Sequence, residues 1–290
     1  MKKIGFIGTG VMGQSIVNHL LSQDYTVMIY NRTKAKAEGL LEKGAVWKET
    51  PAEVAAESDV VFTMVGYPED VDKVYYAENG LFTADVTDKV LIDLTTSTPS
   101  LAEKISRTAV EKGARALDAP VSGGDLGARN GTLTVMVGGD SEVYNEMTAI
   151  FDLFSSSLAL HGPAGSGQHT KMANQIMVAG TMTGLTETLV YADKAGLDLE
   201  KVIKTVGGGA AGNWSLDNYG PRILRRDYSA GFFVKHFIKD LKIALEEAEK
   251  LQLELPATRL AKELYDRLSE SGYDEKGTQA LIKLWWTADD

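Results

Sequence analysis

A glycine-rich segment near the start of the chain has residue types and a spacing that suit phosphate binding. Gly8, Gly10 and Gly13 follow a short apolar run and precede a helical pattern that covers residues 14–21. The first glycine permits a tight turn, the second lets the backbone approach a pyrophosphate, and the third lets the helix pack closely on its strand. The helix N-terminus then faces the phosphates. The residues expected to bind a dinucleotide are Gly8, Thr9, Gly10, Val11, Met12 and Gly13.

The next apolar run, residues 26–30, ends in Asn31, Arg32 and Thr33, with no carboxylate at this tip. In NAD sites an acidic side chain here binds the adenosine ribose, whereas arginine accommodates the 2′-phosphate of NADP. Arg32 can pair with that phosphate, and its two neighbours can add neutral hydrogen bonds. We therefore expect NADP(H) to be preferred and NAD(H) to be possible. The alternative is a solvated arginine in a turn.

The segment 118–124 follows another expected strand, at the edge of the sheet where such folds open their crevice. The hydroxyl of Ser122 and the backbone amides of Gly123 and Gly124 could hold a carboxylate in a backbone nest. A loop with a purely structural role is the alternative.

Lys171 lies four residues beyond Gly167, early in a long helical pattern, and Asn174 and Gln175 share its helical face. Reduction of a carbonyl requires a proton at oxygen as hydride reaches carbon, and a lysine can supply it. The alternative is a solvated charge, since lysines are mostly exposed.

Lys239 and Asp240 enter a later helical pattern. Lys239 could meet the charge of a cofactor or substrate, and Asp240 could orient or neutralise a lysine. The alternative is an acidic residue at a helix N-terminus, where it favours the helix dipole. Since no two histidines have ligand spacing, we expect no metal site.

Short β-rich runs alternate with helical stretches up to about residue 160, which predicts a parallel sheet wound with helices. Pro51 and Pro99 fit the first turns of helices that Thr50 and Thr98 cap. The expected strands are 3–7, 26–30, 45–47, 60–65, 90–94, 115–117, 132–137 and 158–160.

Strand signals nearly vanish after residue 167, and helical periodicity continues to the end, with breaks at 207–212 and before Pro256. We predict an α/β protein with a Rossmann-type doubly wound sheet in residues 1–162 and an all-helical domain in residues 163–290. The first helix of the second domain should cover 168–194. Gly180 and Gly184 weaken that helix, which suggests that another backbone packs against them.

Composition narrows the function classes. The chain has 290 residues, of which 44% are hydrophobic and 24% charged, as in globular proteins. No apolar run reaches membrane-spanning length, and the net charge of −10 argues against nucleic acid or an anionic membrane as partner. The absence of cysteine excludes disulfides and fits a cytoplasmic protein. We expect a small anionic substrate, bound where positive charge is locally concentrated.

Together these segments resemble the β-hydroxyacid dehydrogenases, a family related to 6-phosphogluconate dehydrogenase, over nearly the whole chain. Residues 8–13 are similar to the family's cofactor fingerprint, and residues 118–124 with 131–133 to its substrate signature. Residues 165–174 are similar to its catalytic helix and 239–241 to its C-terminal motif.

The resemblance implies a role for each matched residue. Lys171 would be the catalytic lysine, supported by Asn174 and Asp240. Ser122, Gly123 and Gly124 would bind the substrate carboxylate. Apart from the resemblance, we expect side chains around Phe232 to help set the width of the substrate pocket. The matched positions that line the cofactor are Val65, Thr96 and Lys239. Gln175 departs from the pattern, because many members carry a second asparagine there. A homodimer or homotetramer is implied as well.

The expected activity is an NADP(H)-dependent oxidoreductase that interconverts a small hydroxy acid and its aldehyde or keto acid. One alternative is an NAD-dependent 3-hydroxyacid dehydrogenase of the 3-hydroxyisobutyrate or L-serine type. A non-catalytic cofactor-binding or scaffold module is an alternative from another class, although such relatives can lack the lysine that is present here. An imine reductase usually carries another residue at this position.

Overall fold

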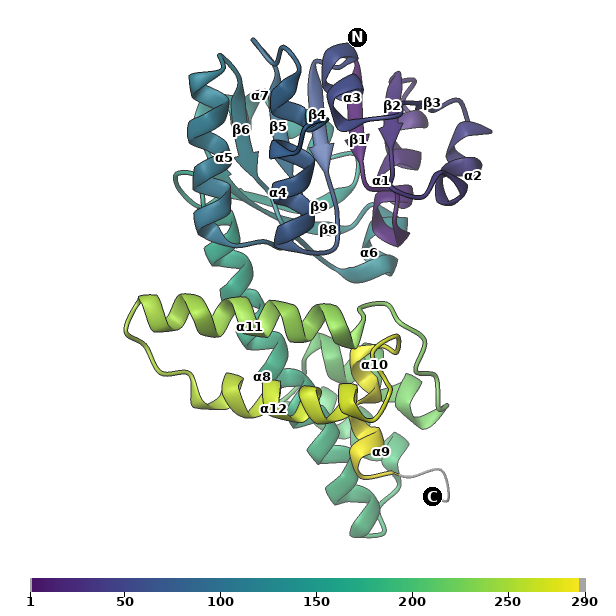
Figure 1. Cartoon of the computed structure of the whole chain (residues 1–290). Helices are drawn as coiled ribbons and strands as arrows, with labels where there is room; N and C mark the ends of the chain where they lie inside the picture. Colours follow the sequence, from purple (N-terminus) through teal and green to yellow (C-terminus); the bar gives the residue numbers. More distant parts are fainter. Residues whose placement is uncertain (1, 287–290) are drawn as a thin grey trace. The chain divides into compact units, whose positions relative to one another are not determined.

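The computed structural model describes residues 2–286. The chain forms two compact units, the first ending at Lys171 and the second beginning at Met172 (Figure 1). The boundary expected between residues 162 and 163 stays a prediction. No helix within residues 2–286 combines the length and the apolar character that crossing a bilayer requires.

The first unit is built on one sheet with the strand order β3-β2-β1-β4-β5-β6-β8-β7, and β9 pairs with β8. The strands are β1 (Ile4–Ile7), β2 (Val27–Tyr30), β3 (Val46–Trp47), β4 (Val60–Thr63), β5 (Val90–Asp93), β6 (Arg115–Asp118), β7 (Val121–Ser122), β8 (Leu133–Gly139) and β9 (Ser155–Leu160). The pairs from β3 to β6 are parallel, whereas β8 is antiparallel to β6 and β7. The order reverses at β1, as in doubly wound dinucleotide-binding sheets, and the expected α/β fold class is confirmed.

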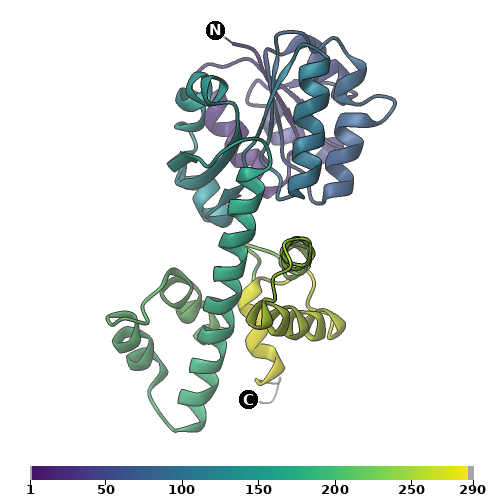
Figure 2. The same cartoon turned by 90° about the vertical axis from the view of Figure 1, so that its left-hand side faces the viewer.

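Helices cover both faces of this sheet. Figures 1 and 2 show α3, α4 and α5 on one face and α1, α6 and α7 on the other. The helical segments of this unit are α1 (Val11–Leu21), η1 (Lys34–Ala37), α2 (Glu38–Leu41), α3 (Pro51–Glu57), α4 (Pro68–Tyr76), η2 (Leu81–Thr83), α5 (Pro99–Glu111), α6 (Gly124–Asn130) and α7 (Ser141–Phe151). Alternate strand residues enter separate cores, so that Phe6 packs with α1 and Ile7 with α3. Burial on both faces explains why these strands are apolar throughout.

Local signals fixed several element boundaries. Thr50 and Thr98 each accept a hydrogen bond from a backbone amide of the following turn, and a proline occupies the first turn in both helices. These two caps are confirmed. The strand β7 was not expected, because two residues are too few to show periodicity.

The second unit is helical and is assembled along α8 (Ser166–Lys194), which begins in the first unit. Figure 2 shows α9 and α10 on one side of α8, and α11 and α12 on the other. The remaining segments are α9 (Leu199–Gly207), α10 (Trp214–Leu224), α11 (Val234–Lys250), α12 (Pro256–Glu270) and η3 (Thr278–Leu284). All of them contribute to one apolar core.

One interpretation of this unit needs correction. Asp240 does not decorate a helix N-terminus, because α11 begins six residues earlier, at Val234, and Asp240 is only 1% exposed. No other described segment of this chain lies against Gly180 or Gly184, since a Cβ built on either glycine would meet nothing within 4 Å. The expectation that another backbone packs against them stays a prediction.

Candidate active site

The turn between β1 and α1 is shaped by its glycines. Gly8 has φ of +99°, and a Cβ there would lie 2.0 Å from the Met64 carbonyl oxygen. A Cβ on Gly13 would lie 2.1 Å from the carbonyl oxygen of Gly8, whereas Gly10 faces open space. The first and third glycines therefore permit close packing, and the second leaves the backbone accessible to a ligand.

The N-terminus of α1 has polar groups that suit a pyrophosphate. Its N-cap residue, Gly10, makes no side-chain capping bond, so first-turn N–H groups remain available to an anion. Thr9 is fully buried, and among the described residues its Oγ1 has no hydrogen-bond partner. These features fit the phosphates of a dinucleotide, which would satisfy the helix amides.

Of the three residues after β2, Asn31 is held by hydrogen bonds, whereas the Arg32 side chain extends into solvent. Asn31 Oδ1 accepts the Thr9 amide at 3.2 Å, and its Nδ2 donates to the Thr33 carbonyl at 2.8 Å. Asn31 thus ties this tip to the glycine turn. The Arg32 side chain is 87% exposed, and its Nη1 lies 3.6 Å from Asp70 Oδ1. A guanidinium so exposed can reach a phosphate, with which the Asp70 carboxylate would compete.

The tips of β4 and β5 are connected by a hydrogen bond. The amide of Val65 donates to Thr95 Oγ1 at 3.0 Å, and Thr96, the next residue, is half-buried. A Cβ on Gly8 would lie 3.2 Å from Val65 Cγ1. The residues expected to line the cofactor, Val65 and Thr96, therefore lie on adjacent loops, and Val65 lies beside the glycine turn.

Ser122 and the two glycines after it join β7 to α6. Gly123 has φ of +126° and Gly124 has φ of +62°, both in the region that favours glycine. Ser122 is half-buried and pairs with Thr134 of β8. Successive amides in such a turn can form an anion-binding concavity, which is what binding a carboxylate requires.

Lys171 lies in the second turn of α8 and is 6% exposed. The alternative of a solvated charge is therefore wrong, because lysines are rarely buried this far without a specific role or partner. Asn174 follows one turn later and is half-buried.

A polar chain in the second unit links three of the expected residues. Asn174 Nδ2 donates to Gln175 Oε1 at 2.7 Å, and Gln175 Nε2 donates to Asp240 Oδ2 at 2.6 Å. The other carboxylate oxygen of Asp240 lies 2.8 Å from Lys239 Nζ. Gln175, which departs from the family pattern, is thus the bridge between α8 and α11. Phe232 lies outside this chain, with its ring 5.6 Å from that of Phe237.

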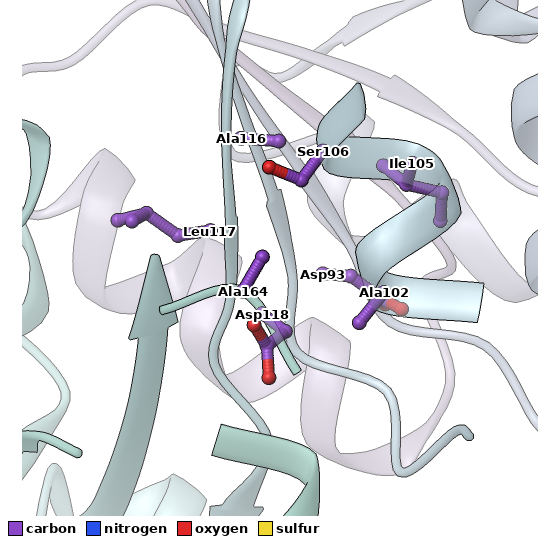
Figure 3. Close-up of a pocket in the computed structure, with 8 residues that line it drawn as sticks. All are labelled: Asp93, Ala102, Ile105, Ser106, Ala116, Leu117, Asp118 and Ala164. Atoms are coloured by element: carbon purple, nitrogen blue, oxygen red, sulfur yellow. The ribbon is translucent and has the colours of Figure 1, made fainter. Parts of the chain in front are cut away.

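A cavity in the first unit lies between α5 and the strands β5 and β6 (Figure 3). Its volume of about 10 Å³ is room for one water molecule, so it is no substrate pocket. Two carboxylates, Asp93 and Asp118, contribute to its lining. Burial raises the pKa of the Asp118 carboxyl, and the backbone amides of Gly165 and Gln168 oppose that rise.

Residues 3–162 match the model of the NAD binding domain of 6-phosphogluconate dehydrogenase, and residues 165–285 match the NAD-binding domain of NADP-dependent 3-hydroxyisobutyrate dehydrogenase. With the glycine turn and the buried lysine, these matches define a nicotinamide-dependent oxidoreductase.

Two related proteins and one solved structure indicate the family of oxidoreductases. The chain is 53% identical to the oxidoreductase YkwC of Bacillus subtilis, covering 98% of this chain and 99% of the other. It is 36% identical to 2-hydroxy-3-oxopropionate reductase of Escherichia coli, covering 97% and 96%. The structure of Mycobacterium tuberculosis 3-hydroxyisobutyrate dehydrogenase with L-serine superposes with a TM-score of 0.89, at 26% identity over 98% of this chain and 99% of that one. The chain belongs to the β-hydroxyacid dehydrogenase family.

Proposed function

We propose that this enzyme uses NADP(H) to interconvert a small hydroxy acid and its aldehyde or keto acid, with Lys171 as proton donor. The observation that carries the proposal is the burial of Lys171 on α8, in a chain whose glycine turn fits a dinucleotide. The exposed Arg32 at the tip of β2, where NAD sites carry an acid, supports the preference for NADP(H).

Each group of the chain has one task in the proposed reduction. When bound at the glycine turn, a nicotinamide cofactor would supply the hydride that the carbonyl carbon accepts. Ser122 and the amides of Gly123 and Gly124 hold the substrate carboxylate, while Lys171 Nζ gives a proton to the carbonyl oxygen as it becomes an alkoxide. Asn174 supports this lysine from the next turn of α8. In the oxidative direction Lys171 accepts the hydroxyl proton.

The test is Lys171→Ala, assayed with a panel of short aldehyde acids and hydroxy acids and with both cofactors. Loss of a general acid should lower kcat by about 100- to 10,000-fold, while the Kd for NADPH stays within about twofold of wild type, because the dinucleotide turn is untouched. Lys194→Ala removes an exposed lysine from the end of the same helix and should leave kcat unchanged. Undiminished turnover in Lys171→Ala would remove the proton donor from the mechanism.

Oxidation of a 3-hydroxy acid with NAD is the second candidate. It is favoured by the structural relative that binds L-serine, since the two folds agree closely. The same panel separates the candidates, because the first predicts tighter NADPH and faster reduction of aldehyde acids, and the second predicts tighter NADH and turnover of hydroxy acids. A scaffold without turnover on any compound would contradict both.

We also propose a homodimer or homotetramer. One face of α8 presents Met177, Gly180, Gly184 and Tyr191. The side chains of Met177 and Tyr191 are 69% and 75% exposed. The open glycines would let a helix of a second copy approach closely. Gly184→Arg should then shift the mass measured by light scattering to that of the monomer, and an unchanged mass would contradict this interface.

A further inference from the structure

The start of α8 is held by a buried carboxylate from the end of β6. Asp118 is 4% exposed, and its Oδ1 and Oδ2 accept the backbone amides of Gly165 and Gln168, both at 2.8 Å. A Cβ on Gly138 or Gly167 would lie within 2.8 Å of one of these oxygens. The carboxylate therefore occupies a close-fitting site at the positive end of the α8 dipole. Figure 3 shows Asp118 beside Ala164, next to the segment that leads into α8.

A second buried side chain ties the first turn of α8 to the loop after β5. Gln168 is fully buried, its Oε1 accepts the Ser97 amide at 2.9 Å, and its Nε2 donates to the Thr95 carbonyl at 2.8 Å. Thr95 Oγ1 in turn accepts the Val65 amide at 3.0 Å. One hydrogen-bonded network thus joins the tips of β4, β5 and β6 to α8, entirely within the first unit.

We propose that Asp118 and Gln168 are positioning residues that hold Lys171 in place relative to the loops of Val65 and Thr95. This inference rests on the proposed role of Lys171. Gln168 lies one helical turn before Lys171, so a slip or a fraying of the first turn moves the ammonium group directly. Misplacement by about 1 Å can cost about 100-fold in rate.

Asp118 and Gln168 make different kinds of hydrogen bonds, so each can be tested by a different substitution. The Asp118 carboxylate has two acceptor oxygens, which accept two backbone amides, and it cannot donate. The Gln168 side-chain amide has one acceptor, used by the Ser97 amide, and one donor group, used by the Thr95 carbonyl of the same loop. Asp118→Asn replaces an acceptor with a donor facing an amide. Gln168→Glu keeps the acceptor for Ser97 and removes the donor to Thr95. Both substitutions therefore break one identified contact with little change of volume.

The experiment measures kcat, KM and the Kd for NADPH in Asp118→Asn, Gln168→Glu and Lys171→Ala, with the substrate that wild type turns over best. We expect kcat to fall 10- to 100-fold in the two positioning variants, with KM and Kd within about threefold. Asp140→Asn is the matched control. Asp140 caps α7 through the amides of Glu142 and Val143, and kcat should stay within twofold there.

A double variant distinguishes a positioning residue from a cap that only stabilises the fold. In the Lys171→Ala background, Asp118→Asn should lower the residual turnover by no more than twofold, because Asp118 acts through Lys171. A further 10-fold loss there, or an unchanged kcat in Asp118→Asn alone, overturns the proposal. If Asp118→Asn does not fold, Asp118→Ser keeps one acceptor and carries the same test.

Failure of the proposed function looks different. If the proposed function is wrong, the wild-type protein will turn over none of the acids, or Lys171→Ala will keep full activity. In either case hydrogen exchange still tests the positioning network. Asp118→Asn should speed exchange of the amides of residues 168–171 at least 10-fold over wild type, and equal rates would overturn the anchoring role.

Discussion

Replacing Arg32 with alanine should weaken binding of NADPH and leave binding of NADH nearly unchanged. The Arg32 guanidinium is 87% exposed and has Asp70 3.6 Å away, so its contact with a phosphate would be made in high dielectric. Two unit charges 4 Å apart in water attract by about 1 kcal/mol, and a phosphate monoester carries nearly two charges. We therefore expect a loss of about 1.5 to 2 kcal/mol, which is about a 10- to 30-fold rise in Kd.

The assay is fluorescence titration of both reduced cofactors at low and high salt. Asp70→Asn should tighten NADPH about two- to fivefold, because the competing carboxylate is removed from Arg32. Lys104→Ala is the matched control, since it removes the same charge from α5, where Lys104 pairs with Asp72. Equal changes in NADPH and NADH affinity in Arg32→Ala would refute the assignment of Arg32 to the 2′-phosphate.

Three further predictions concern the turn, the polar chain and pH. Gly13→Ala should abolish cofactor binding or folding, because its Cβ would lie 2.1 Å from the Gly8 oxygen; unchanged titration and circular dichroism would contradict this. Gln175→Leu should lower the free energy of unfolding by about 1 to 3 kcal/mol, because it leaves a buried oxygen of Asp240 without its donor; an unchanged urea midpoint would count against the bridge. Burial lowers the pKa of His236 in the folded protein below its ordinary value of 6.5. As the pH falls below 6.5, the unfolded state therefore binds more protons than the folded state, and the free energy of unfolding should fall from pH 7 toward pH 5. His236→Gln should show a shallower fall in denaturant titrations, and an equal slope would contradict the assignment.

Much of the first unit could be predicted because its signals are local. The glycine spacing after an apolar strand, and a threonine before a proline, each act within a few residues of backbone. Strand positions followed from runs of apolar residues that a sheet buried on both faces requires. The two-residue β7 exists only because β8 offers a partner, so no local pattern indicates it.

The start of α11 shows where a local pattern could not choose between two roles for one residue. The sequence left two roles open for Asp240, a partner that orients or neutralises a lysine and an acid at a helix N-terminus, where it favours the helix dipole. In the structure Asp240 is buried in the second turn, beside Lys239 and Gln175. Gln175 lies 65 residues away in sequence, and that distance explains why the pairing left no readable signal.

The amino-acid sequence alone determined the two-part architecture and the dinucleotide turn, and it led to Lys171 as the proposed proton donor, because each depends on neighbours along the chain. Only the tertiary structure decided that Lys171 is buried and that Asp118, 50 residues before Gln168, holds the helix that carries it. The physical reason is that burial and hydrogen bonding depend on which groups the fold brings together, and residues far apart in sequence are neighbours only in the folded chain.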